Sequence, residues 1–248
     1  MFGQRRESAK EILDEQAQVW EQKPVLKRIY SRYLRLALES CSPGSMLELG
    51  AGSGVLKKCG CDALSTDVEK MPGIDIVADA QSMPLRDESF ENIIAIDLFH
   101  HIERPVRLLR EARRVLKPGG RLLLIEPGIT PVSRWFYDCF HPELVDLTAD
   151  PLLDGPIDPK KNPFDANQGF ATILVTQRKC ALEEVVPGLS IVDHKWIGSL
   201  AYPLSGGFQR WSLVPTVLVE SVLSLESLVD SIFGRWLAFR LLVTLERH

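Results

Sequence analysis

Short apolar runs and stretches with helical spacing alternate along this chain. The apolar runs are bounded by glycine, proline or acidic residues, and they predict strands at 46–49, 63–67, 74–79, 89–97 and 121–127. The run from Ile93 to Ile96 has no polar position, which is typical of a parallel strand covered on both faces. Residues 105–116 carry apolar side chains at helical spacing, and the following Lys-Pro-Gly-Gly ends that helix.

The segments on either side of this stretch are also patterned. Prolines dominate residues 150–167, where few apolar residues recur, so we expect a long loop there. Elsewhere the spacing predicts two helices within 7–40 that break near Pro24, a helical segment at 167–184, and sixth and seventh strands at 189–202 and 235–247.

The most informative feature is the turn that follows the first strand. Residues 46–54 read Met-Leu-Glu-Leu-Gly-Ala-Gly-Ser-Gly, with glycines at alternate positions. Glycine lets a backbone bend sharply and lets a ligand approach closely. A nicotinamide or flavin fingerprint would need glycine where Val55 stands, and the Gly-Lys-Ser/Thr of a triphosphate loop is absent. The pattern that remains is Glu-x-Gly-x-Gly-x-Gly.

This pattern resembles the first motif of the class I S-adenosylmethionine-dependent methyltransferases. In order, spacing and punctuation, residues 44–127 look most like the group that includes the ubiquinone and menaquinone biosynthesis enzymes, known as methyltransferase type 11. The resemblance implies an α/β, Rossmann-like sheet of seven strands with helices on both faces. It places the last strand antiparallel between the fifth and sixth. It also implies an enzyme, a transferase whose cofactor is S-adenosyl-L-methionine.

The resemblance implies one methyltransferase domain over the whole chain, residues 1–248. Within it we expect a helical lid at 1–42, a cofactor-binding core at 43–127, an acceptor-side insertion at 128–168 and an apolar helical insertion at 212–234.

The cofactor-binding residues follow by position from the resemblance. The methionine end of the cofactor is assigned to the first motif, the ribose to the acid that ends the second strand, and the adenine to the acid after the third strand and its neighbour. One more acid follows the fourth strand. In order, these residues are Glu48, Gly50, Ala51, Gly52 and Gly54, then Asp67, then Asp79 and Ala80, and lastly Asp97. Only twelve residues separate Gly54 from Asp67, so the first helix of the core is short.

His100 and His101 are the candidate catalytic residues, because they follow the fourth strand, where the methyl group should lie. Imidazole titrates near neutrality and can act as a general acid or base. A packing or orienting role for the pair is an open alternative. His141 and Asp146 are weaker candidates. No metal site is expected, because no His-x-x-x-His spacing is present and the five cysteines are irregularly spaced.

The expected acceptor is a small molecule, such as a sugar, a quinone or a lipid-linked metabolite. A formal charge of −4 argues against nucleic acid, because a duplex binder needs a basic face. Asp97-Leu98-Phe99-His100 also stands where an Asp/Asn-Pro-Pro-Tyr motif would indicate a planar amino group. Two other classes stay open: a non-catalytic S-adenosylmethionine-binding or scaffold protein, and a nicotinamide oxidoreductase.

Residues 212–234 are unusually apolar, with a narrow polar stripe. Acids at Glu220, Glu226 and Asp230 interrupt the run, so no membrane span is predicted. The segment is interpreted as a cap on the sheet, as a dimer face, or as a peripheral membrane contact for a lipid-linked acceptor. The oligomeric state is left open. A polar start and an odd number of cysteines predict a cytoplasmic protein.

Overall fold

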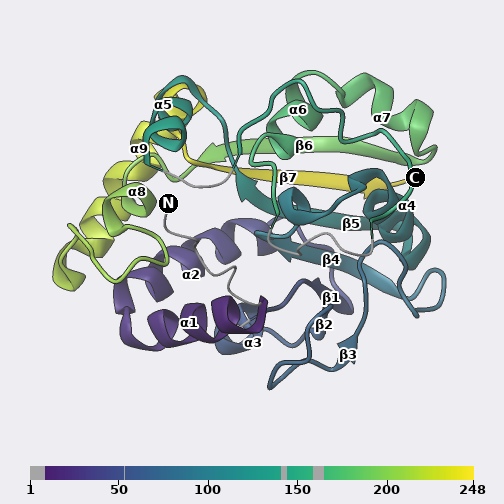
Figure 1. Cartoon of the computed structure of the whole chain (residues 1–248), viewed down its shortest axis with the longest axis horizontal. Coiled ribbons are helices and arrows are strands. Elements are labelled where there is room, and N and C mark those ends of the chain that lie inside the picture. Colours follow the sequence, from purple (N-terminus) through teal and green to yellow (C-terminus); the bar gives the residue numbers. More distant parts are fainter. Residues whose placement is uncertain (1–8, 53, 141–143, 159–164) are drawn as a thin grey trace, which may run out of the picture.

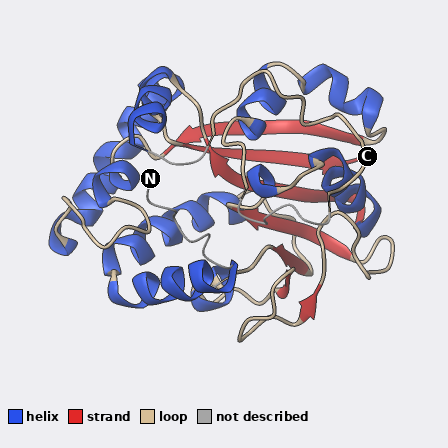
Figure 2. Cartoon of the chain, viewed as in Figure 1, coloured by secondary structure: helices blue, strands red, loops and turns tan. Residues whose placement is uncertain are grey.

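The computed structural model describes residues 9–52, 54–140, 144–158 and 165–248. Its centre is a seven-stranded sheet with the order β3-β2-β1-β4-β5-β7-β6. β7 pairs antiparallel with both β5 and β6, whereas the remaining pairs are parallel. This is the sheet that the sequence predicted (Figures 1 and 2). The strands are β1 (Met46–Leu49), β2 (Leu64–Asp67), β3 (Ile76–Val77), β4 (Phe90–Ile96), β5 (Leu116–Pro127), β6 (Leu189–Ile197) and β7 (Arg240–Arg247).

Helices cover both faces of the sheet (Figure 2). On one face pack α4 (Pro105–Val115), α6 (Phe170–Thr176) and α7 (Lys179–Val185). On the other face pack α2 (Pro24–Leu38), α3 (Val55–Lys58), α8 (Ala201–Ser205) and α9 (Val219–Leu237). Two more helices, α1 (Ala9–Gln22) and α5 (Pro131–Phe140), and two short 3-10 turns at Phe99–His101 and Thr216–Leu218 complete the described elements.

The two hydrophobic cores follow from the pleat of the strands. Ile93 packs in the core beneath α4, and its neighbour Ile94 packs in the core beneath α2. Leu122 and Leu123 divide between the same two cores. Successive side chains of a strand point to opposite faces, so a strand that is apolar at every position must be covered on both.

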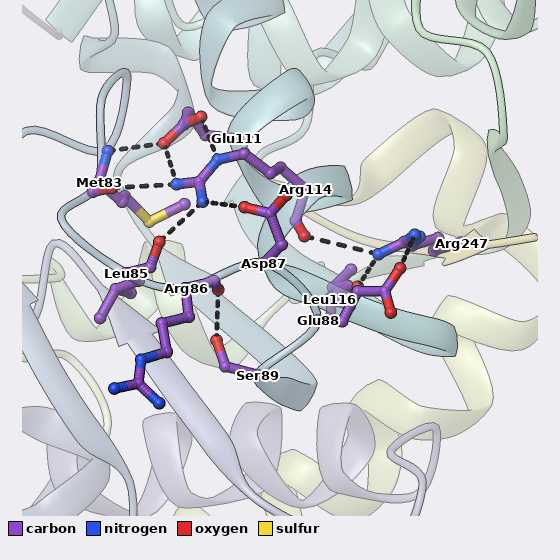
Figure 3. Close-up of polar contacts among 10 residues, drawn as sticks. All are labelled: Met83, Leu85, Arg86, Asp87, Glu88, Ser89, Glu111, Arg114, Leu116 and Arg247. Carbon is purple, nitrogen blue, oxygen red and sulfur yellow. Dashed lines mark hydrogen bonds and ion pairs between the residues drawn. The ribbon is translucent and has the colours of Figure 1, made fainter.

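The loop between β3 and β4 is tied to α4 by one guanidinium (Figure 3). Arg114 donates to the backbone carbonyls of Met83 and Leu85, and it pairs with Glu111 and Asp87 at 2.7 Å each. Because a single side chain satisfies two carbonyls and two carboxylates, this loop is held at the point where β4 begins.

Several element boundaries differ from the sequence prediction. The third strand, expected at 74–79, is only Ile76–Val77, and the apolar helix expected at 212–234 begins at Val219. Residues 235–237 continue α9, and the seventh strand begins only at Arg240. β5 begins at Leu116, ahead of the Lys-Pro-Gly-Gly segment, because Leu116 already pairs with Phe90 of β4. Residues 167–184 form two helices, α6 and α7, since the first ends at a C-cap on Gln177. The sixth strand stops at Ile197, and its expected extension is α8.

The predicted break between the two N-terminal helices is confirmed at Lys23 and Pro24. Proline suits the first turn of a helix, where its missing N–H has no partner to lose. The Lys23 side chain is buried and its ammonium donates to a ring of backbone carbonyls at 2.6–2.9 Å, those of Ser205, Gly207, Gln209 and Trp211. The junction of α1 and α2 is thereby fixed to the loop after α8.

Candidate functional site

The candidate site lies where the carboxyl ends of the parallel strands meet, and the glycine turn after β1 is its centre. The backbone φ angles are +63° at Gly50, +48° at Gly52 and +75° at Gly54. All three are in the left-handed region, which L side chains with a Cβ rarely adopt. The alternate glycines are therefore explained by the backbone path of this turn.

Two of these glycines are also closely approached by other elements. A Cβ on Gly50 would lie 2.7 Å from Leu98 Cδ1, just beyond β4. A Cβ on Gly52 would lie 3.3 Å from Leu13 Cδ2 on α1. Helix α1 therefore covers the turn, in the position expected of a lid, and the turn contacts the segment that carries the two histidines.

Glu48 stands on β1 just before the turn and is 3% exposed. Its Oε1 accepts a hydrogen bond from the backbone N–H of Leu56 at 3.3 Å, whereas Oε2 has no hydrogen-bond partner within the described part of the chain. Burial raises the pKa of Glu48 to about 7. A buried carboxylate oxygen without a partner is suited to a cationic ligand group, such as the ammonium of an amino acid.

Asp67 ends β2 beside the turn and is buried. Its Oδ2 accepts the backbone N–H of Gly52 at 2.7 Å, and its Oδ1 accepts that of Glu69 at 2.8 Å. A carboxylate oxygen has two lone pairs, so both oxygens retain capacity for the hydroxyls of a ribose. The short helix α3, with four residues, does not carry Asp67 away from the glycine turn.

The two residues assigned to the adenine lie at the carboxyl end of β3, on the outer edge of the sheet. Asp79 is exposed, and its Oδ1 accepts the backbone N–H of Gln81 at 2.8 Å. Ala80 is buried in the core under α4. Their side chains thus face different surroundings, one solvent and one the protein interior.

Asp97, which follows β4, is held by two side chains. Its Oδ1 lies 2.5 Å from Arg240 Nη2, and its Oδ2 accepts the hydroxyl of Tyr30 at 2.7 Å. Its φ of +54° is unusual for a residue other than glycine. The contacts of Asp97 therefore involve residues from β7 and α2 that are far away in sequence.

Arg240 was not identified from the sequence. It is 2% exposed, begins β7, and its guanidinium lies 5.0 Å from the ring centroid of Tyr202. Because β7 is antiparallel, its first residue lies at the carboxyl ends of its neighbours, and this places a buried cation in the site. The available signal was one arginine directly before the apolar run Leu241–Val243.

His100 forms a buried pair with Glu126, the acid near the end of β5. His100 Nδ1 lies 2.5 Å from Glu126 Oε2, and the two side chains are 4% and 0% exposed. Glu126 Oε1 also accepts the backbone N–H groups of Leu98 and Phe99, at 3.0 and 2.7 Å. The carboxylate thus positions the imidazole and the short turn that carries it. The role of Glu126 was missed, because it is one acid in an apolar strand.

The other histidine candidates differ from His100 in their placement. The ring of His101 stacks on that of His100, with centroids 4.1 Å apart. His141 lies outside the described residues. Asp146, the remaining candidate, accepts the backbone N–H and the hydroxyl of Thr148. Of the candidates, His100 is the one whose buried position beside a carboxylate is established by the structure.

The acceptor-side insertion contains a helix that the sequence analysis did not predict, α5, followed by the long loop. Asp154 in this loop pairs with Arg107 and Arg110 of α4 at 2.8 and 2.5 Å, and Leu152 is buried. The described part of the loop is thus anchored to α4.

Comparison with known proteins gives a consistent family. Residues 41–124 match the family model described as "Methyltransferase domain". The human "Probable tRNA methyltransferase 9B" is 35% identical over 117 residues, covering 42% of this chain and 26% of that protein. The "Demethylmenaquinone methyltransferase" of Thermotoga maritima is 32% identical over 151 residues, covering 51% of this chain and 64% of that protein. The chain spans about a quarter of the length of the tRNA methyltransferase 9B relatives it matches.

A solved structure supports the fold over most of the chain. A Thermotoga maritima protein described as a "SAM-dependent methyltransferase, possible histamine N-methyltransferase" aligns with a TM-score of 0.53. The alignment covers 90% of this chain and 99% of that one, at 17% sequence identity. At this identity the likeness concerns the fold alone.

Proposed function

We propose that this chain, which belongs to the class I S-adenosylmethionine-dependent methyltransferases, moves a methyl group to a small-molecule acceptor by direct in-line transfer. The observation that carries the proposal is the buried His100–Glu126 pair at the carboxyl end of β4. This pair adjoins the glycine turn through Leu98, which packs on Gly50. A proton acceptor and a cofactor cradle therefore lie next to each other.

The residues around the turn fit S-adenosylmethionine. The partnerless oxygen of Glu48 suits the cationic methionine end, and the left-handed glycines form a turn without Cβ atoms beside it. Asp67 is held by the N–H of Gly52 and keeps lone pairs for the ribose hydroxyls. When bound, the cofactor supplies a methyl group already activated by its sulfonium.

The chain's own contribution is orientation, exclusion of water and removal of a proton. Helix α1 lies over the turn and shields it from solvent. Holding two reactants in the transfer geometry lowers a barrier by roughly 7–11 kcal/mol. The Glu126 carboxylate keeps the proton of His100 on Nδ1, so Nε2 is the atom that takes a proton from an acceptor hydroxyl or acidic carbon.

A small molecule is favoured over RNA as the acceptor by the net charge of −4. The tRNA-directed name belongs to relatives that this chain matches over about a quarter of their length. The glycine turn and the acid after β2 are both intact, which favours a catalyst over a scaffold with the same fold. We place the reaction in the cytoplasm.

The direct test is methyl transfer from isotope-labelled S-adenosylmethionine into fractionated extract of the source cell. We expect label, dependent on the protein, in a small-molecule fraction, either aqueous or organic. Label that nuclease digestion converts to nucleotides would overturn the small-molecule assignment. Tight cofactor binding with no label in any fraction would favour the non-catalytic scaffold.

The affinity for S-adenosylmethionine should rise with pH through neutrality. The ionised form of Glu48 binds the cationic methionine end, and its pKa without ligand is about 7. Only about a tenth of the carboxyl groups are ionised at pH 6, against about nine tenths at pH 8, so we expect roughly tenfold tighter binding at pH 8. Titration calorimetry across this range measures the effect.

A matched control is available for this pH effect. Glu48→Gln should lower the affinity and remove most of its pH dependence. Glu226, on α9, also has a pKa raised to about 7 by burial, so Glu226→Gln removes a similar titration away from the glycine turn. A pH dependence that survives Glu48→Gln, or disappears with Glu226→Gln, would contradict the assignment.

A further inference from the structure

Helix α9 turns two of its three acids into the protein and leaves large apolar side chains outside. The third acid, Glu220, is exposed. Glu226 is 3% exposed and accepts the backbone N–H groups of Leu200 and Ala201 at 2.8 and 2.5 Å. Asp230 accepts a hydrogen bond from the backbone N–H of Gly198 at 2.9 Å and another from the hydroxyl of Ser199. Glu226 and Asp230 therefore bind the segment between β6 and α8 instead of solvent.

The large apolar side chains of α9 face outward. They follow one another at intervals of three, four, one and three residues, and each is more than half exposed: Leu225, Leu228, Ile232, Phe233 and Trp236. We call these five residues the apolar ridge. Only a narrow strip of the helix, with Val219, Leu223 and Gly234, is buried against the protein. An exposed apolar surface of this kind is typical of an interaction site.

The ridge continues onto α5, which packs beside α9 (Figure 1). On α5, Trp135 and Phe140 are 62% and 66% exposed, with ring centroids 5.8 Å apart. Among the described residues, no helix is long and apolar enough to cross a membrane. The surface is thus suited to lying on an apolar boundary rather than passing through one.

A basic groove of about 400 Å³ borders α9 on its α2 side. Four cations line it, Lys27, Arg28, Arg32 and Arg35, together with one acid, Glu220. The acid lies 3.8 Å from Arg28 and is largely exposed. Lys27 is also paired, with Glu21 at 2.9 Å, so the excess of positive charge comes chiefly from Arg32 and Arg35. The groove and the apolar ridge share helix α9.

We propose that α9 docks the protein on the surface of an anionic lipid bilayer. The apolar ridge enters the boundary between headgroups and acyl chains, and the lipid phosphates meet the cations of the groove. An anionic bilayer is favoured as the partner by charge complementarity, because helices that lie at membrane surfaces combine an apolar face with neighbouring cations. A second copy of the chain would cover the ridge and leave the groove without anions, whereas RNA would fill the groove and leave the ridge in water.

Two of the three acids of α9, Glu226 and Asp230, are hydrogen-bonded within the protein and do not oppose this docking. The third, Glu220, is exposed and lies 3.8 Å from Arg28 of the groove. In the sequence the three acids argued against a membrane span and left a peripheral contact open. The proposal concerns where the protein binds and does not depend on methyl transfer.

The test is co-sedimentation of the full chain with vesicles of phosphatidylcholine, with and without about 30% phosphatidylglycerol. The anionic lipid gives the vesicle surface the negative potential that attracts basic residues. We expect binding to the anionic vesicles that weakens in high salt, because salt screens the groove. Leu228→Ser with Ile232→Ser should reduce the partition coefficient at least tenfold. Arg28→Gln with Arg35→Gln should reduce it on anionic vesicles only.

The matched control is Val77→Ser with Val192→Ser, which removes two exposed apolar side chains from the strands at the two edges of the sheet. It should bind vesicles like the unchanged protein. The proposal is overturned if the unchanged chain ignores anionic vesicles, or if the ridge variant binds as well as the control. It is also overturned if the ridge variant instead dissociates a dimer in light scattering, or if RNA binds the groove while vesicles do not.

Discussion

Replacing Gly52 with valine is expected to weaken S-adenosylmethionine binding by about a hundredfold or more, a loss of roughly 2.7 kcal/mol or more. At Gly52 the backbone has a φ of +48°, a conformation that a β-branched residue avoids. The new Cβ would lie 3.3 Å from Leu13 Cδ2, and the N–H that holds Asp67 at 2.7 Å would move with the strained turn. Both proposed cofactor contacts, at the methionine end and at the ribose, would shift. Calorimetric titration with S-adenosylmethionine measures the loss.

Gly60 provides the matched control, because it has a φ of +83° and no atom within 4 Å of an added Cβ. Gly60→Val introduces similar backbone strain at the end of α3 without touching the turn. We expect it to lower the melting temperature and to preserve the cofactor affinity. Normal binding by Gly52→Val would show that the turn does not hold the cofactor. An equal loss in both variants would assign the effect to overall stability.

The sheet was predictable from the sequence because its signals are local. The glycine turn, the apolar run of β4 and the proline that begins α2 each act within a few residues of where they stand. The order and direction of the strands, including the antiparallel β7, came from the resemblance that these local signals carry. The composition contributed one point to the prediction, namely that the chain has no excess of basic charge.

The polar contacts of the site were not predictable, because their partners are distant in the sequence. Glu126 and His100 come from different strand ends, and Arg240 reaches Asp97 from the last strand of the sheet. In the sequence, Glu126 and Arg240 are charged residues next to apolar runs, and nothing local marks them as partners. Only the pairing of β4 with β5 and of β5 with β7 brings them to one edge.

The orientation of α9 shows a further limit of periodicity. The spacing of its apolar and polar residues defines two faces but does not say which one meets the protein. The choice was decided by the backbone N–H groups of residues 198–201, which need acceptors where α8 begins. Glu226 and Asp230 supply these acceptors, and the apolar face is left outside.

Replacing His100 with glutamine is expected to lower the rate of methyl transfer about a hundredfold while the cofactor affinity changes less than about threefold. A positioned general base contributes roughly a hundredfold to ten-thousandfold in rate. Initial rates of label transfer into the accepting fraction, together with calorimetric titration of the cofactor, test the prediction.

Glu126→Gln separates positioning from direct participation. The amide would place an N–H donor opposite His100 Nδ1, where the carboxylate now lies at 2.5 Å, and this favours the tautomer whose Nε2 already carries a proton. We therefore expect a comparable loss of rate, with cofactor affinity retained. His101→Gln changes the side chain that stacks on His100 and should lower the rate less than about fivefold, against the larger loss expected for a general base. If His101→Gln abolished transfer and His100→Gln did not, the roles of the two histidines would be reversed. If neither variant slowed transfer, the acceptor would need no base, and orientation alone would account for the rate.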